Sequence, residues 1–257
     1  MGTAATHIAG RTAWTGASLA LLILLWAVAA WLADRRFLPA PLPVFERMAE
    51  GVASGELLYH TGVTLARVAA SFVLAMGIGC AIGIVMGRRR QIDRFFDGWL
   101  ILFLNMPALV TIILCYIWFG LNEAAAVLAV AINKIPNAAV TLREGARALD
   151  RDYHEMASVY EFGDWKTFRH VTLPQLMPYM AAAARSGLAL VWKIVLVVEL
   201  LGRPNGVGYA ISYYFQLFDV RAVLGYSLAF SAVMLLIEYG ALQPLEAHAR
   251  RWRPAPA

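Results

Sequence analysis

Long apolar runs dominate this chain and leave few possible folds. A helix needs about 20 residues, at 1.5 Å per residue, to cross a hydrocarbon layer about 30 Å thick. Runs of about that length cover residues 12–33, 68–87, 98–122, 124–142, 176–201 and 222–245. Hydrophobic residues make up 60% of the chain and charged residues only 15%, which is too apolar for a water-soluble domain. The sequence therefore predicts a membrane protein.

The secondary structure of these runs follows from the lack of hydrogen-bond partners in lipid. Every backbone amide of a span needs an internal partner, and the runs do not alternate as barrel strands do. We therefore expect an all-α membrane protein with six transmembrane helices. The first run could instead be a signal peptide cleaved after Ala27-Val28-Ala29, but its length favours a retained helix.

Basic residues in the polar segments predict the orientation. If the N-terminus is cytoplasmic, the inside segments carry thirteen Lys and Arg residues and the outside segments carry five. Basic residues concentrate in cytoplasmic loops, so both termini are expected in the cytoplasm. Because this asymmetry accounts for most of the net charge of +5, we expect no nucleic-acid partner.

The polar stretches divide the chain into three predicted parts. Residues 1–56 hold the first span and an outer segment, which is expected to be extended over the prolines of 37–43 and to continue as an interfacial helix. That helix is predicted over 44–58. Residues 57–245 form the core, including an outer loop at 202–221 that is expected to be re-entrant or interfacial. Residues 246–257 form a basic cytoplasmic tail.

Several kinds of chemistry have no signature in the sequence. There is no G-x-x-x-x-G-K-[ST] loop, so the chain itself is not expected to hydrolyse ATP. Cys80 and Cys115 lie in apolar runs and the five histidines lack ligand spacing, so we expect no disulfide, metal or cofactor. The glycines within 77–83 are interpreted as small residues for close helix packing. Catalysis by this chain is not expected.

One polar block, 150–173, interrupts the apolar pattern. Connecting loops are typically about 4–6 residues long, so a longer one usually has a partner. Two short helices are predicted in it, over 153–160 and 165–170, with a turn around Gly163. Met156, Val159 and Tyr160 share a face of the first helix, and Trp165, Phe168 and Arg169 share a face of the second. The block is either an interfacial helix pair on the headgroups or a surface for a cytosolic subunit.

This block resembles the cytoplasmic coupling segment of binding-protein-dependent ABC importer permeases. That family carries E-A-A, a Gly six residues after the Glu and a Pro nineteen after it. The corresponding residues here are Glu155, Met156, Ala157, Glu161 and Pro174. Because the family Gly is replaced by Glu161, we expect the left-handed bend to have moved to Gly163.

Further marks are similar to those of the subgroup that imports nitrate, sulfonates and taurine. They are W-F-G at 118–120, Pro107, Pro136, Trp192, E-L-L-G at 199–202 and G-x-G-Y at 206–209. The resemblance implies the type I ABC importer permease architecture. It also implies the function, which is the membrane-spanning permease subunit of an ATP-driven importer in the cell inner membrane.

Partners and coupling residues follow from the same resemblance. It implies a permease homodimer, two cytosolic ATPase subunits that hold ATP and Mg, and a solute-binding protein outside. The residues implied for ATPase coupling are Glu155, Met156, Ala157, Tyr160, Glu161, Gly163, Trp165, Phe168, Arg169 and Pro174.

Polar residues inside the spans predict the solute pathway. A buried cation costs at least about 2.5 kcal/mol on insertion scales, so it should face a partner or a wet path. The candidates are Lys134, Lys193, Arg67, Asn133, Asn137 and Glu199. The alternative is pairing with Glu199 or Glu123, which we favour for Arg67. If both lysines face the axis of a dimer, their charge predicts an anionic solute such as nitrate, a carboxylate or a sulfonate.

Two other functions remain open at this stage. A secondary carrier or channel for a small ion would need acids for a proton relay, and only Glu199 and Glu238 lie inside spans. It would also leave the polar block unexplained. A membrane anchor without transport fits poorly with the number of charges inside the spans.

Overall fold

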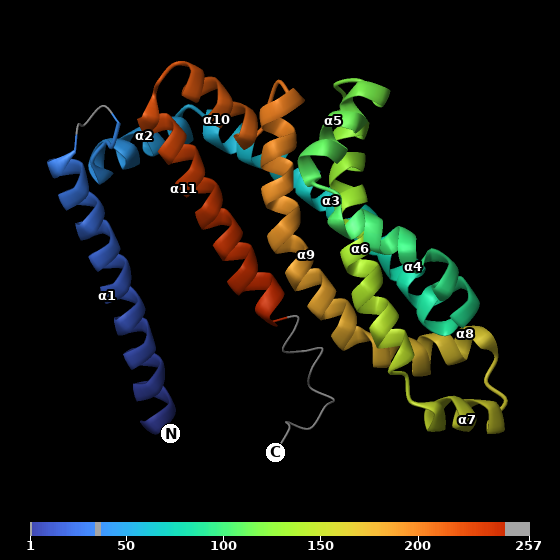
Figure 1. Cartoon of the computed structure of the whole chain (residues 1–257). Helices are drawn as coiled ribbons and strands as arrows, with labels where there is room; N and C mark the ends of the chain where they lie inside the picture. Colours follow the sequence, from blue (N-terminus) through green and yellow to red (C-terminus); the bar gives the residue numbers. More distant parts are fainter. Residues whose placement is uncertain (1, 34–36, 245–257) are drawn as a thin grey trace.

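The computed structural model describes residues 2–33 and 37–244, and every regular element in these residues is a helix. Figure 1 shows them in chain order. They are α1 Gly2–Leu32, α2 Pro41–Ala53, α3 Glu56–Arg88, α4 Arg90–Asn105, α5 Ala108–Phe119, α6 Glu123–Arg147, α7 Arg151–Val159, α8 Asp164–Thr167, η1 Phe168–Thr172, α9 Leu173–Gly202, α10 Val207–Gln216, α11 Val220–Ile237 and η2 Glu238–Leu242. The predicted all-α class is confirmed, while the basic tail at 246–257 lies outside the described residues.

Four helical stretches of the described chain are long and apolar enough to cross a membrane. They are Glu56–Arg88, Glu123–Arg147, Asp164–Gly202 and Val220–Gly240. The pair α4 and α5 makes a fifth if it counts as one span, and Gly16–Leu32 in α1 is a shorter apolar helix. The count of six spans therefore stays a prediction.

The third predicted span is not one straight helix. The chain breaks at Met106 and Pro107, and α4 and α5 meet at an angle of 97°. Pro107 has no amide hydrogen to donate into the preceding turn, and it disfavours the helical region for Met106, which has ψ 123°. The expectation of a continuous helix over 98–122 was wrong for this local reason.

Glycines bring α3 and α6 into close contact along the centre of the molecule. A methyl group on Gly79 would lie 2.6 Å from the Cβ of Ala138, and one on Gly83 would lie 2.4 Å from the Ala139 carbonyl oxygen. Gly87 meets Ala146 in the same way, one helical turn further on. Small residues at this four-residue spacing let two backbones approach, as predicted for 77–83.

One end of the molecule gathers α2, α10 and the start of α3 (Figure 1). The prediction of an extended chain over 37–43 was wrong for its last part, because α2 begins at Pro41. First-turn amides have no helical partner, so prolines are tolerated there. A hydrogen-bond chain joins the elements, since Arg47 donates to the Tyr214 hydroxyl at 2.9 Å, which donates to Glu56 at 2.9 Å. Burial, followed by this bond to Glu56, raises the pKa of Tyr214.

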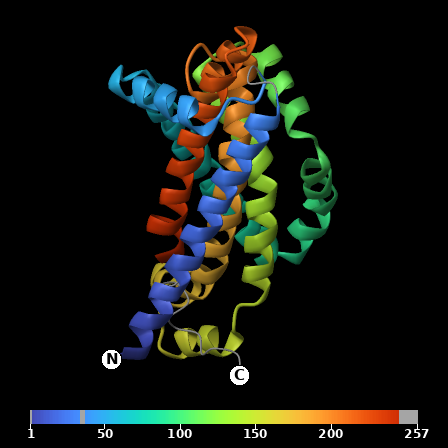
Figure 2. The same ribbon diagram turned by 90° about the vertical axis from the view of Figure 1, so that its left-hand side faces the viewer.

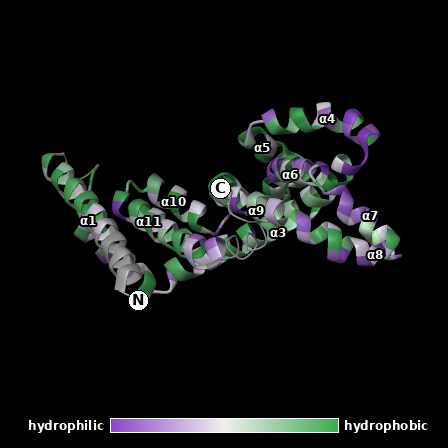
Figure 3. Cartoon of the chain, turned by 90° about the horizontal axis from the view of Figure 1, so that it is seen from below, coloured by the Kyte–Doolittle hydropathy of each residue, from purple (hydrophilic) through white to green (hydrophobic). Residues whose placement is uncertain are grey.

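The opposite end carries α7, α8 and the start of α1 (Figures 1 and 2). Figure 3 shows hydrophilic residues gathered there, on α7, α8 and part of α4. The second predicted helix of the polar block is not separate, because 164–202 runs as one helix into the membrane span. A π-helical turn, in which the Leu173 amide donates to the Phe168 carbonyl, precedes Pro174. The wider turn lets the helix continue although Pro174 has no backbone N–H to donate. Pro174 therefore lies within this helix and does not start a new one.

Candidate functional site

The polar block presents an exposed aromatic and aliphatic surface. On α7, Val159 is 80% exposed and Met156 is 41% exposed, and Tyr160, just after the helix, is 70% exposed. Trp165 on α8 is 70% exposed and stacks on Phe168 with ring centroids 6.0 Å apart. These five residues, with the exposed Glu155, Arg169 and Pro174, are called the docking face below. Bulky apolar side chains exposed at a polar end of a molecule are typical of a binding surface.

The bend between α7 and α8 lies at Glu161, not at Gly163. Glu161 has φ +50° in the left-handed region, whereas Gly163 has φ −64°. The Phe162 amide donates to the Ala157 carbonyl at 2.8 Å, and the Glu161 amide donates to Ser158 at 3.0 Å. This pair of bonds is a Schellman motif. The expectation that the bend had moved to Gly163 was wrong, because the hydrogen bonds fix the left-handed position whichever residue occupies it.

Few polar contacts hold α7 against the rest of the molecule. The His154 Nε2 atom lies 3.1 Å from Arg88 on α3 and 3.3 Å from the Thr172 hydroxyl. The Asp150 amide donates to the Gln175 side chain at 2.9 Å. Ala157 is the one residue of α7 with its side chain buried, at 1% exposure, so it fixes the position of the helix while its neighbours face outward.

At the other end, Arg67 is the centre of a buried ion-pair cluster. Its guanidinium donates to Glu123 at 2.7 and 2.8 Å, to Glu199 at 2.8 Å, and to the carbonyl and side chain of Asn205. All five donors of the guanidinium are therefore used. Arg67 is 5% exposed, and Arg203 adds a second cation beside Glu123. Arg67 thus has the structural role that the sequence favoured for it, with no donor left for a solute.

Glu199 completes this cluster from α9 and is fully buried. Its second oxygen accepts hydrogen bonds from the Thr64 hydroxyl at 2.9 Å and the Gly208 amide at 2.8 Å. A methyl group on Gly206, which has φ +105°, would lie 2.3 Å from the Glu199 carboxylate. The glycines of 206–208 therefore let the backbone wrap around the acid. An acid held this way is a poor member of a proton relay.

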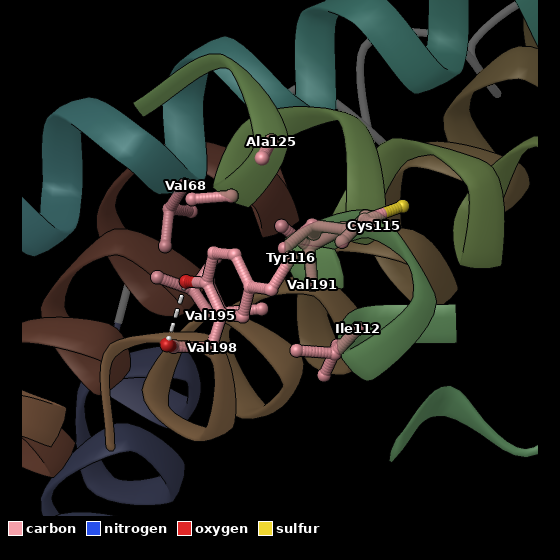
Figure 4. Close-up of a cluster of buried hydrophobic side chains, with 11 residues drawn as sticks. Val68, Ile112, Cys115, Tyr116, Ala125, Val191, Val195 and Val198 are labelled. Atoms are coloured by element: carbon pink, nitrogen blue, oxygen red, sulfur yellow. Dashed lines mark hydrogen bonds between the residues drawn. The ribbon is translucent and has the colours of Figure 1, made fainter. Parts of the chain in front are cut away.

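Below this cluster, α5, α6 and α9 share an apolar core (Figure 4). The Tyr116 hydroxyl donates to the Val198 carbonyl at 2.9 Å, one residue before Glu199. Ile112, Val191 and Val195 are buried around the tyrosine ring. The core and the ion-pair cluster together fix the C-terminal half of α9 against α5 and α6.

Lys134 is the exception to this pattern of satisfied buried charges. Its side chain is 1% exposed between α6, α3 and α9, and its ammonium has no hydrogen-bond partner among the described residues. In its present position it packs directly on Gly187, where a Cβ would lie 2.4 Å from the lysine Cε. Glu199 and Glu123, which the sequence offered as partners, are paired with arginines instead.

The other predicted pathway residues lie in different environments. Lys193 is exposed on α9, where its ammonium lies 5.6 Å from the centroid of the Trp192 ring. Asn133 and Asn137 are half-buried and donate along α6 to the carbonyls of Ala129 and Asn133. Their side-chain oxygens and the neighbouring Thr141 form a polar stripe on this helix. The structure therefore does not bring the two lysines to one face of a single chain.

A family model now decides what kind of protein this geometry belongs to. Residues 74–243 match the family described as the binding-protein-dependent transport system inner membrane component. The chain belongs to that family. It is therefore an ABC transporter permease, a multi-pass integral membrane protein whose family is not catalytic.

Curated relatives of the permease span nearly its whole length. The putative aliphatic sulfonates transport permease protein SsuC of Bacillus subtilis is 29% identical, and the match covers 91% of this chain and 85% of that protein. The bicarbonate transport system permease protein CmpB of Synechococcus elongatus is 29% identical, covering 78% and 77%. The taurine transport system permease protein TauC of Escherichia coli is 24% identical, covering 91% and 88%. The resemblance to the nitrate, sulfonate and taurine subgroup is confirmed.

The fold of the permease also matches a solved structure. A chain from the MetNI methionine ABC transporter, in inward facing conformations, superimposes with a TM-score of 0.62 at 16% identity. The match covers 72% of this chain and 92% of that one. The type I ABC importer permease fold is confirmed.

Several residues of the ion-pair cluster could not be identified from the sequence of the permease. Thr64 and Asn205 gave no signal, because a single polar residue near a helix end is usually solvated. His60, which accepts a hydrogen bond from the Gly206 amide at 3.0 Å, had no sequence signal either. The G-x-G-Y motif was the available signal, since closely spaced glycines mark a backbone that approaches another group.

Proposed function

We propose that this permease is the membrane-spanning subunit of an ATP-driven importer in the cell inner membrane for a small solute with an anionic group. The anionic character of the solute is inferred from Lys134, whose buried ammonium has no hydrogen-bond partner among the residues that the structure describes. An unpaired cation in low dielectric attracts an anion more strongly than surface charges do. The names of the relatives agree, because sulfonates, bicarbonate and taurine all carry an anionic group.

A mechanical link supports a connection between Lys134 and the docking face. The second half of the coupling segment, from Asp164, is continuous with the span that ends at Gly202. Gly187, which covers the Lys134 side chain, lies in this same helix. A displacement of the segment would therefore move the helix that closes over the ammonium. We infer that Lys134 meets the solute when α9 moves away from α6.

The partners proposed are two cytosolic ATPase subunits that hold ATP and Mg, a solute-binding protein outside and a second copy of the permease. The docking face is the proposed ATPase contact. Its exposed tyrosine, tryptophan and methionine are residue types that dominate binding energy in interfaces. In this arrangement, closure of the two ATPase subunits moves the coupling segments toward each other. The spans then rock from an inward-facing to an outward-facing arrangement.

Substitution of the docking face tests the coupling role. Replacing Tyr160 and Trp165 together by alanine should weaken ATPase binding at least about 30-fold, because each is an exposed aromatic of the kind that forms hot spots. The measurement is co-purification with the ATPase and solute-stimulated ATP hydrolysis. Phe215→Ala is the matched control, since Phe215 is 67% exposed on α10 at the opposite end. Normal assembly and coupling in the double variant would leave the segment as an interfacial helix pair.

Removal of the Lys134 charge tests the solute role. Lys134→Met keeps most of the side-chain volume, and uptake of a sulfonate, taurine or bicarbonate into proteoliposomes should fall about 10- to 100-fold, the loss of one charged hydrogen bond. Lys193→Met, which removes an exposed ammonium from α9, should have a smaller effect. Co-purification with the ATPase shows that the complex still assembles. Uptake at the wild-type rate in an assembled Lys134→Met complex would return this lysine to a purely structural role.

A further inference from the structure

A lateral groove between α3, α4 and α6 is not used by the proposed transport function. It has a volume of about 740 Å³ and is lined almost wholly by apolar side chains. Ile82 and Val85 form one wall, Phe96 and Trp99 form the second, and Ile135 and Pro136 form the floor. Trp99 is 59% exposed, so the groove opens to the outside of the chain. Its walls on α3 and α6 belong to candidate membrane spans, so apolar side chains that face outward there meet lipid or another protein.

The length of the groove suits an acyl chain. Its lining on α4 runs from Ile92 to Phe103, which is about 16 Å of helix. The groove therefore has the length and the apolar lining that an acyl chain of a lipid requires.

A basic turn closes the groove at the end nearest the docking face. The chain passes from α3 to α4 through Arg88, Arg89 and Arg90, and Arg94 follows one turn later. Arg88 contacts His154 of α7, which places this turn at the end of the molecule that carries the docking face. Arg89, Arg90 and Arg94 are exposed, and no ion pair joins them to any part of the chain that the structure describes.

The acids nearest this turn are already neutralised by other arginines. Asp97 pairs with Arg143 at 2.6 Å, and Asp93 pairs with both Arg143 and Arg147. The positive charge at the mouth of the groove is therefore uncompensated. A cluster of basic residues at the cytoplasmic end of a membrane helix attracts anionic lipid headgroups.

We propose that this groove binds an anionic phospholipid, with an acyl chain along Trp99 and Phe96 and the phosphate against the arginines of the α3–α4 turn. The apolar lining supplies affinity for the chain, and the arginines supply selectivity for the headgroup. α4 forms one wall of the site, so a bound lipid would support a helix whose main contacts in the described chain are with α3 and α6.

Quenching by brominated lipids tests the proposal on the full chain in nanodiscs. The emission of Trp99 is obtained by subtracting the tryptophan emission of the Trp99→Phe variant from that of the wild type. Brominated phosphatidylglycerol should quench it at a lower mole fraction than brominated phosphatidylcholine. Arg89→Gln, Arg90→Gln and Arg94→Gln combined should remove that preference, with about a fivefold loss for each arginine. Arg221→Gln, which removes an exposed cation from the first turn of α11, is the control and should keep the preference.

Each other outcome would overturn the proposal. Equal quenching by the two lipids in wild type would mean that the groove does not select an anionic headgroup. A preference that survives in the triple variant would separate the arginines from the site. If neither lipid quenches and Trp99→Cys forms a disulfide between two copies, a second permease chain covers the groove.

Discussion

The two ends of this permease handle polar and charged groups in opposite ways. At the end that carries α2, α10 and the start of α3, Arg67 and Glu199 are buried and every donor of the guanidinium has an acceptor. At the other end, Tyr160 and Trp165 are exposed, and α7 is held by a few hydrogen bonds through His154 and Asp150. The first arrangement fixes helices to one another, while the second leaves a surface for another molecule. Lys134 lies between them and follows neither pattern.

The largest effect should come from breaking the buried cluster. Glu199→Leu leaves the Arg67 guanidinium short of an acceptor in a buried site, which is expected to cost about 3–5 kcal/mol. The measurement is unfolding in detergent together with the amount of protein in the membrane. Glu46→Leu, on an exposed position of α2, is the control and should change stability by less than about 0.5 kcal/mol. A Glu199→Leu protein as stable as wild type would remove the contrast between the two ends.

A smaller loss is expected from Gly206→Ala. The backbone there has φ +105° and ψ 167°, a region that is essentially restricted to glycine, and the new methyl would strike the Glu199 carboxylate. The expected destabilisation is about 1–3 kcal/mol from the backbone alone, before the collision is counted. Gly62→Ala, with open space around its position in α3, provides the comparison by the same unfolding measurement. Equal stability of the two variants would show that the loop does not depend on glycine.

The smallest of these effects is a gain in stability, and it is expected in the coupling segment. Glu161→Gly removes the penalty of a left-handed residue with a side chain, offset by the entropy of glycine, for a net stabilisation of about 0.5–1 kcal/mol. Local opening of α7, followed by amide hydrogen exchange, measures it. Gly163→Ala, at an ordinary φ of −64°, is the control and should be tolerated. Destabilisation by the change at 163, with no gain from the change at 161, would return the bend to the position that the sequence suggested.

The helical class and the family of the chain could be predicted from its sequence, but two helix boundaries could not. Apolar runs and the order of motifs were sufficient for the all-α class and for the resemblance to the importer permeases, both now confirmed. The break at Pro107 was missed although the proline was seen, because prolines within spans often only bend them. The continuity of α8 with α9 was missed for the opposite reason, because Pro174 looked like a helix start and a π-helical turn accommodated it instead.

By itself, the sequence determined that this chain folds as membrane helices and which polar block interrupts them. Hydrophobic length and backbone hydrogen bonding are local requirements that each segment meets alone. Tertiary structure alone decided which charges are paired. Arg67 lies 132 residues from Glu199 and 56 from Glu123, and only the packing of α3 against α6 and α9 brings the three together. The same packing leaves the Lys134 ammonium without a hydrogen-bond partner in the described part of the chain, because the acids inside the spans are bound by arginines.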